Sequence, residues 1–193
     1  MAGLFKDGLN RNERILYIAD SNQPVDVIAS LTKNNIDTKA YLHNNQFTLK
    51  KSTEIPVRGK DFDSAKLFDV FSKELDKTKR HRYAALRIIS EMTCVMLGPP
   101  GSGRLTAYEA VINNIIAKGN SLAVCMFDRR RFLPELLVEA LKTHPFTIIG
   151  MQFCNNIFYI PPEELIPNNT QLTELNHYIK MILLCNKHKP TGG

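Results

Sequence analysis

Short apolar runs rich in β-branched residues alternate along this chain with longer segments whose apolar residues recur at helical spacing. The runs at residues 15–19, 83–92, 122–127 and 147–153 are largely continuous, as expected for strands that are buried on both faces of a sheet. Pro24 suits the first turn of one intervening helix, and Asp63 or Ser64 could cap another. Alternating strands and helices predict an α/β fold with a mostly parallel sheet covered by helices on both faces.

Composition limits the class of protein further. The 193 residues, 44% hydrophobic and 23% charged, are typical of one globular domain with a substantial core. The sequence holds no apolar run of the roughly 18 residues that span a bilayer, so it predicts a cytoplasmic protein without membrane contact. The four cysteines form no CxxC pair, which favours free thiols over a metal site or a disulfide.

The positive charge raises the possibility of nucleic-acid binding. The formal net charge is +6 and the sequence pI is about 9.2, and clustered basic residues can neutralise phosphates. The clusters at residues 77–82 and 187–189 are small, and helix C-termini favour such charges. A nucleic-acid-binding regulator is therefore kept as an alternative, but nucleic acid is not the expected partner.

A Gly/Pro-rich segment resembles a phosphate-binding loop. The pattern GxxxxGK[ST] uses backbone amides, a lysine and a hydroxyl to hold phosphates and magnesium. Here Arg104 stands in the lysine position and Leu105 in the hydroxyl position. A nucleotide-binding protein or NTPase is therefore the alternative rather than the expectation, and no cofactor is predicted. A weaker anion-binding loop would comprise Gly98, Gly101, Ser102, Gly103 and Arg104.

Polar residues follow the predicted strands at their carboxyl ends, where open parallel sheets bind ligands. Asp20 and Ser21 follow the first strand, Glu91 ends the central one, and Asp128 and Arg130 follow the next. These five residues are the candidate ligand-binding site. Because Glu91 lies in an apolar run, it needs a partner or a proton if buried, and an arginine from residues 129–131 is the expected partner.

Apolar residues next to these polar groups could form the walls of a ligand pocket. Met92, Cys94, Met126 and Phe127 are the candidates. A small, weakly polar ligand would gain affinity by desolvation in a mostly apolar pocket.

The last helical segment is predicted at residues 170–186, with a cap at Asn169 or Thr170. Its many apolar residues indicate either packing on its own domain or an exposed face used for dimerisation.

Four stretches together resemble the MEDS family of sensory domains. They read GLNRNERILYIADSNQPVDVIASLTKNNID, ALRIISEMTCVMLGPPGSGRLTAYEAVIN, LAVCMFDRRRFLPELLVEALKTHPFTIIG and IFYIPPEEL. The resemblance implies a RecA-like three-layer α/β sandwich related to the KaiC ATPases, with the first strand and its phosphate loop missing here. It also implies a non-catalytic role in prokaryotic signal transduction, sensing a small organic molecule such as a hydrocarbon derivative.

The resemblance also suggests domain limits and partners. We expect a sensory domain over residues 1–165 and a separate C-terminal helix over residues 166–193. The implied partners are a small organic ligand and a signalling protein, such as a histidine kinase or a DNA-binding regulator. The helix at residues 170–186, or the sheet edge left open by the missing first strand, predicts either a homodimer or docking to such a partner.

Overall fold

The computed structural model describes residues 1–57, 62–94, 104–150, 152–161, 164 and 169–187. The chain divides into two compact units, Met1–Leu133 and Pro134–Gly193, each of which is described by itself. No helix among the described residues is long and apolar enough to cross a membrane. Unit 1 contains, in chain order, α1 (Ala2–Asn10), β1 (Arg14–Ala19), α2 (Pro24–Lys33), α3 (Thr38–His43), β2 (Phe47–Lys51), η1 (Ser52–Glu54), α4 (Ser64–Arg80), β3 (Leu86–Glu91), α5 (Arg104–Ala117) and β4 (Ser121–Met126).

A four-stranded parallel sheet forms the middle layer of unit 1. Its order is β2-β1-β3-β4, and Tyr17 of β1 stands opposite Leu49 of β2 and Ile89 of β3. Helices flank the sheet, so the predicted three-layer α/β architecture is confirmed. The closer relationship to RecA-like proteins stays a prediction.

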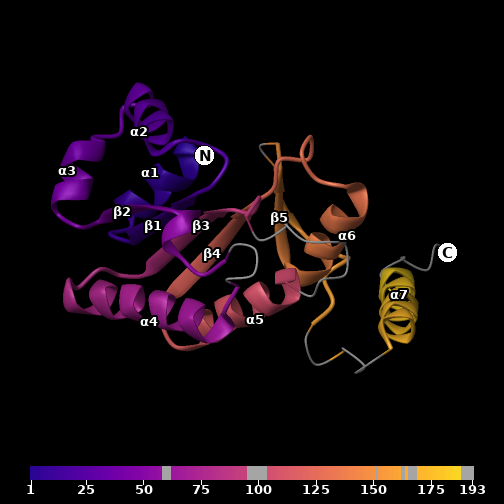
Figure 1. The fold of residues 1–193 in the computed structure, drawn as a ribbon. Coiled ribbons are helices and arrows are strands. Elements are labelled where there is room, and N and C mark those ends of the chain that lie inside the picture. Colours follow the sequence, from indigo (N-terminus) through magenta and orange to yellow (C-terminus); the bar gives the residue numbers. More distant parts are fainter. Residues whose placement is uncertain (58–61, 95–103, 151, 162–163, 165–168, 188–193) are drawn as a thin grey trace. The chain divides into compact units, whose positions relative to one another are not determined.

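Side-chain alternation along β1 divides the core into two layers. Tyr17 and its neighbours at alternate positions pack with α1 and α2, whereas Leu16 and Ile18 pack with α4 and α5. Figure 1 shows these two helix pairs on opposite sides of the sheet. All six residues of β1 are buried, which explains why its sequence is continuously apolar after Arg14.

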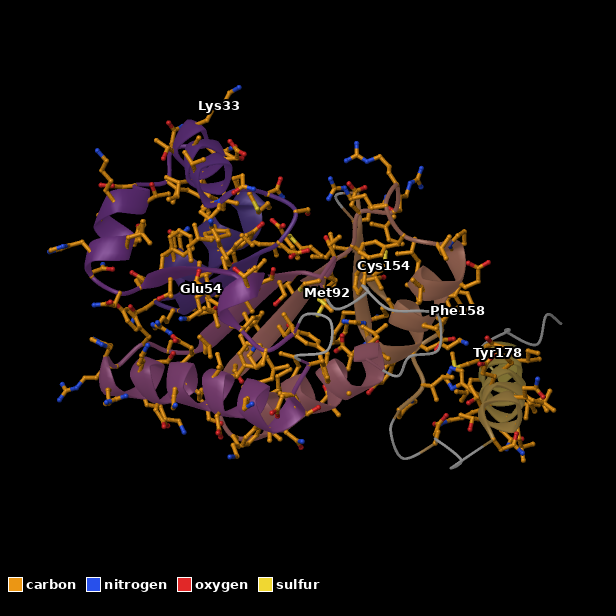
Figure 2. The ribbon with its side chains drawn as sticks, in the orientation of Figure 1. Lys33, Glu54, Met92, Cys154, Phe158 and Tyr178 are labelled. Atoms are coloured by element: carbon orange, nitrogen blue, oxygen red, sulfur yellow. The ribbon has the colours of Figure 1, made fainter. Side chains whose placement is uncertain are left out.

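Local signals set several helix ends as expected. Pro24 occupies the first turn of α2, and the Asp63 side chain accepts a hydrogen bond of 3.0 Å from the Lys66 N–H at the start of α4. Lys33 ends α2, where the helix dipole favours a positive charge. Its side chain extends away from the unit (Figure 2).

Two arginines of the sheet form ion pairs beneath the helices. Arg14 contacts Glu74 of α4 at 2.7 Å, with both side chains at most 3% exposed. Arg87 of β3 contacts Glu13 at 2.7 Å and Asp7 of α1 at 2.7 Å. Removal of one partner from such a pair would leave an uncompensated charge inside the protein.

The short helix α3, between α2 and β2, has only one local signal in the sequence. The Asp37 side chain accepts a hydrogen bond from the Ala40 N–H at 3.1 Å and begins α3. Six residues are too few for a clear apolar period, so the cap was the only local signal.

Unit 2 contains α6 (Pro134–Thr143), β5 (Phe146–Ile149), β6 (Gln152–Asn155) and α7 (Thr170–Lys187). The single strand predicted at residues 147–153 is wrong, because β5 and β6 pair as an antiparallel hairpin. Gly150 interrupts the run with φ of +63°, a conformation that glycine adopts without steric cost. The predicted cap of α7 is confirmed, since the Asn169 side chain accepts from the Leu172 N–H at 3.0 Å.

Candidate functional site

The sheet order places a topological switch point between β1 and β3. The chain leaves β1 toward β2 on one side, and then returns through α4 to β3 on the other side. Loops at the carboxyl ends of two such strands diverge, and the space between them is the usual ligand position in open parallel sheets. The candidate site lies at this edge.

Glu91, the last residue of β3, binds the loop that follows β1. Its Oε2 atom accepts hydrogen bonds from the backbone N–H groups of Asp20, Ser21 and Asn22 at 2.9, 2.7 and 3.0 Å, and from the Ser21 hydroxyl at 3.1 Å. Its Oε1 atom accepts from the Tyr17 hydroxyl at 2.6 Å and from Asn22 Nδ2 at 2.7 Å. One carboxylate thereby fixes the conformation of the whole loop.

This arrangement keeps Glu91 ionised. Burial by itself raises the pKa of this carboxyl, but the hydrogen bonds from Tyr17, Asn22 and the backbone outweigh burial and hold the pKa below its usual range. Burial and the neighbouring carboxylate raise the pKa of Tyr17. Tyr17 therefore remains a donor to Glu91.

The prediction that an arginine from residues 129–131 pairs with Glu91 is wrong. Arg130 instead forms a bidentate contact with Asp128, with Nε–Oδ1 and Nη2–Oδ2 distances of 2.8 Å each. The hydrogen bonds from Arg130 lower the pKa of Asp128 to about 2. Neutral donors were sufficient for Glu91 because three consecutive backbone N–H groups converge on one oxygen atom.

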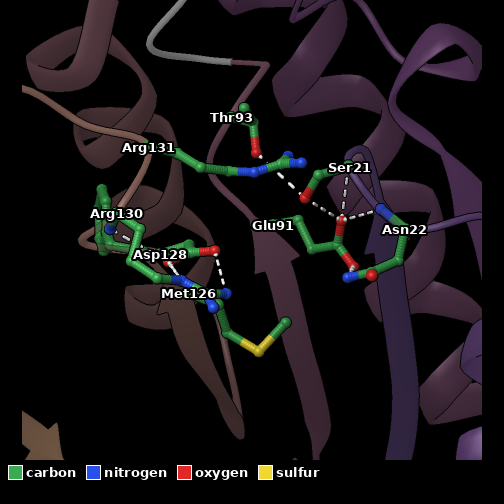
Figure 3. A pocket seen from close by; sticks show the side chains of 9 residues that line it. Ser21, Asn22, Glu91, Thr93, Met126, Asp128, Arg130 and Arg131 are labelled. Atoms are coloured by element: carbon green, nitrogen blue, oxygen red, sulfur yellow. Dashed lines mark hydrogen bonds and ion pairs between the residues drawn. The ribbon is translucent and has the colours of Figure 1, made fainter.

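A cavity of about 350 Å³ opens beside Glu91 (Figure 3). Side chains from the ends of β1, β3 and β4 line this cavity, which we call the edge cavity. Its lining residues are Ser21, Asn22, Glu91, Thr93, Met126, Phe127, Asp128, Arg130 and Arg131.

Arg131 extends across the edge cavity toward Ser21 and Thr93 (Figure 3). Within the part of the chain that the structure describes, no hydrogen bond or ion pair of its side chain is recorded. The half-buried Thr93 places its hydroxyl 3.4 Å from the Ser21 hydroxyl. The cavity thus presents the exposed guanidinium of Arg131 and two adjacent hydroxyls.

The predicted site residues mostly come together. Ser21, Glu91, Asp128 and Arg130 all line the edge cavity. The side chain of Asp20 turns instead to the Ser52 hydroxyl after β2, although its backbone N–H donates to Glu91. Of the predicted anion loop, residues 98–103 lie outside the described residues, and Arg104 is the first residue of α5.

The walls of the cavity differ from expectation. Met126 and Phe127 line it, but Met92 and Cys94 are buried in the core between the sheet and the helices α4 and α5. Successive residues point to opposite sides, so Met92 turns away where Glu91 faces the loop. The edge cavity is therefore mostly polar and not mostly apolar.

Tyr17 and Thr93 belong to the site, but the sequence analysis did not single them out. Tyr17 lies in a buried strand, and a buried tyrosine hydroxyl usually has a hydrogen-bond partner, so this residue carried a usable signal. Thr93 follows Glu91 by two positions, but it lies past the end of the strand, where alternation no longer fixes side-chain direction.

Comparison with known proteins identified one family. The sequence profile of MEDS, the methanogen/methylotroph, DcmR sensory domain, matches residues 1–145 of the 193-residue chain. A search of curated proteins gave no match. The matched region contains all the residues that line the edge cavity.

Proposed function

Since the chain belongs to the MEDS family of sensory domains, which indicates a sensory role in signalling, we propose that it senses a small molecule bound in the edge cavity. In this proposal the protein binds its ligand without transforming it. Lining residues come from the ends of three neighbouring strands, at the position where open parallel sheets receive ligands. That placement is the observation that carries the proposal.

A ligand in this cavity would contact two separate loops. Ser21 and Asn22 belong to the loop after β1, whereas Asp128, Arg130 and Arg131 follow β4. A ligand that touches both loops favours the conformation in which they are close, and the difference in affinity between the two conformations sets the size of the shift. The signal would thus be a change in the distance between these loops.

Thermal shift of the full chain tests ligand binding. Native-state binding raises Tm as ligand concentration increases, and small organic compounds, including hydrocarbon derivatives, form the screen. Thr93→Phe places a bulky ring in the edge cavity and should abolish the shift. Thr53→Phe is the matched control, because Thr53 is exposed in η1 and does not line the cavity. A ligand whose shift survives Thr93→Phe would place the binding site elsewhere and refute the proposal.

The output partner is proposed to be a second copy of the chain or a signalling protein, contacted through α7. Thr173 and His177 on this helix are buried, whereas Leu175, Ile179 and Ile182 are 55%, 47% and 61% exposed. The exposed apolar side chains recur at helical spacing, which is typical of a helix that packs against another surface. Sedimentation of the full chain and of a variant lacking residues 168–193 tests the homodimer. A monomer at high concentration in both would refute it.

A further inference from the structure

We infer that the ligand of the edge cavity is a small organic monoanion whose carboxylate is bound by Arg131. This inference rests on the proposed function, because it names the chemical class that the same cavity would take. It departs from the weakly polar ligand that an apolar pocket would favour.

The charged side chains that line the cavity differ in how many hydrogen bonds and ion pairs they make. The carboxylate of Asp128 already faces the guanidinium of Arg130 in a bidentate contact at 2.8 Å. Glu91 accepts six hydrogen bonds, more than the roughly four lone-pair sites of a carboxylate, so it has no capacity left for a ligand donor. Arg131 alone among the charged lining residues makes no hydrogen bond or ion pair with its side chain within the described residues, although its charge also acts on Asp128.

The groups near Arg131 are suited to a carboxylate. A guanidinium presents a planar fork of N–H donors that matches the two oxygen atoms of a carboxylate. The hydroxyls of Thr93 and Ser21 lie on the side toward which Arg131 extends (Figure 3). The one O–H of Ser21 already donates to Glu91, but Thr93 can turn its O–H from the long 3.4 Å contact with Ser21 to a bound carboxylate. Thr93 belongs to the segment after β3 and Arg131 to the loop after β4, so a bound carboxylate would join these two segments.

Neighbouring charges favour one negative charge over two. Glu91 and Asp128 are both ionised, as their lowered pKa values indicate, and Arg130 and Arg131 balance them. A monoanion would leave one net negative charge in the cavity, whereas a phosphate dianion would leave two and be repelled more strongly. The volume of about 350 Å³ lies near the lower end for ligand pockets, which fits a compact molecule.

Matched acids and amides test the inference on the full chain. The probes are acetate, propionate, butyrate and benzoate, their primary amides, and inorganic phosphate, each at about 10 mM, where even millimolar Kd values give a measurable shift. At least one carboxylate should raise Tm while its amide does not. Arg131→Ala should weaken the binding of that carboxylate about ten- to hundredfold, which is the loss of affinity expected for a hydrogen bond to a charged group. Arg129→Ala is the control, because Arg129 is exposed in the same loop but does not line the cavity.

Each other outcome overturns the inference. Equal shifts from an acid and its amide, a larger shift from phosphate, no shift from any carboxylate, or equal loss in Arg129→Ala and Arg131→Ala would each refute it. A neutral ligand whose Tm shift is abolished by Thr93→Phe but retained in Arg131→Ala would refute the inference of a carboxylate ligand and leave the proposed function intact. A shift that Thr93→Phe does not change would refute both.

Discussion

Replacement of Glu91 by glutamine tests whether one carboxylate organises the loop after β1. The amide has one acceptor oxygen, so if that oxygen accepts from the backbone N–H groups of residues 20–22, its NH₂ group faces Tyr17 and Asn22. Hydrogen bonds to a charged group contribute about 1.5–3 kcal/mol and neutral ones about 0.5–1.5 kcal/mol. Since the bonds are not additive, we expect a loss of about 3 kcal/mol in the free energy of unfolding.

Urea and thermal denaturation of the full chain measure this loss. At about 2–4 °C per kcal/mol for a chain of this size, Tm should fall by about 6–12 °C. Asp76→Asn is the control for the change in charge, because Asp76 is exposed on α4. Hydrogen exchange at the amides of residues 20–22 should accelerate in Glu91→Gln and not in the control.

The pH dependence gives an independent check on the mechanism. Because the folded-state pKa of Glu91 is lowered, its contribution is present above the unfolded pKa of about 4.3 and is lost as pH falls through the folded pKa. The stability difference between the wild type and Glu91→Gln should therefore shrink below about pH 4. A difference under about 0.5 kcal/mol at pH 7, the level of an ordinary surface substitution, or one that stays constant down to pH 3, would refute the reasoning.

Two further predictions concern the packing of unit 1. A Cβ atom at Gly8 would lie 2.8 Å from Nε of the ion-paired Arg87, so Gly8→Ala should lower the free energy of unfolding by about 1–3 kcal/mol. A Cβ atom at Gly3 would meet nothing within 4 Å, so Gly3→Ala should be neutral or stabilising by up to about 1 kcal/mol. Equal urea midpoints for the two variants would contradict this prediction. Arg14→Met should cost about 3 kcal/mol, the low end for a broken buried ion pair, because Glu74 then keeps only the half-exposed Lys77 as a partner. The double variant Arg14→Met/Glu74→Leu should recover most of that loss in the same assay, and a double variant as unstable as the single one would contradict this explanation.

The sequence by itself determined the α/β architecture and the edge of the sheet at which the candidate site lies. Continuous apolar runs identified β1, β3 and β4, because a strand buried on both faces needs apolar side chains at nearly every position. Pro24, Asp63 and Asn169 marked helix starts through local hydrogen bonding and backbone geometry. Parallel strands align their carboxyl ends, so Ser21, Glu91 and Asp128 were expected to lie near one another, as they do at the edge cavity.

Only the tertiary structure decided how the groups at that edge pair with one another. A sequence shows that Glu91 needs a partner, but the partner depends on directions and distances between segments about 70 residues apart. The loop after β1 supplied backbone N–H groups, which every residue except proline carries and which therefore leave no sequence signal. With Glu91 satisfied by that loop and Arg130 paired to Asp128, Arg131 was left to face the cavity, because side-chain pairing is settled by three-dimensional proximity and not by residue type.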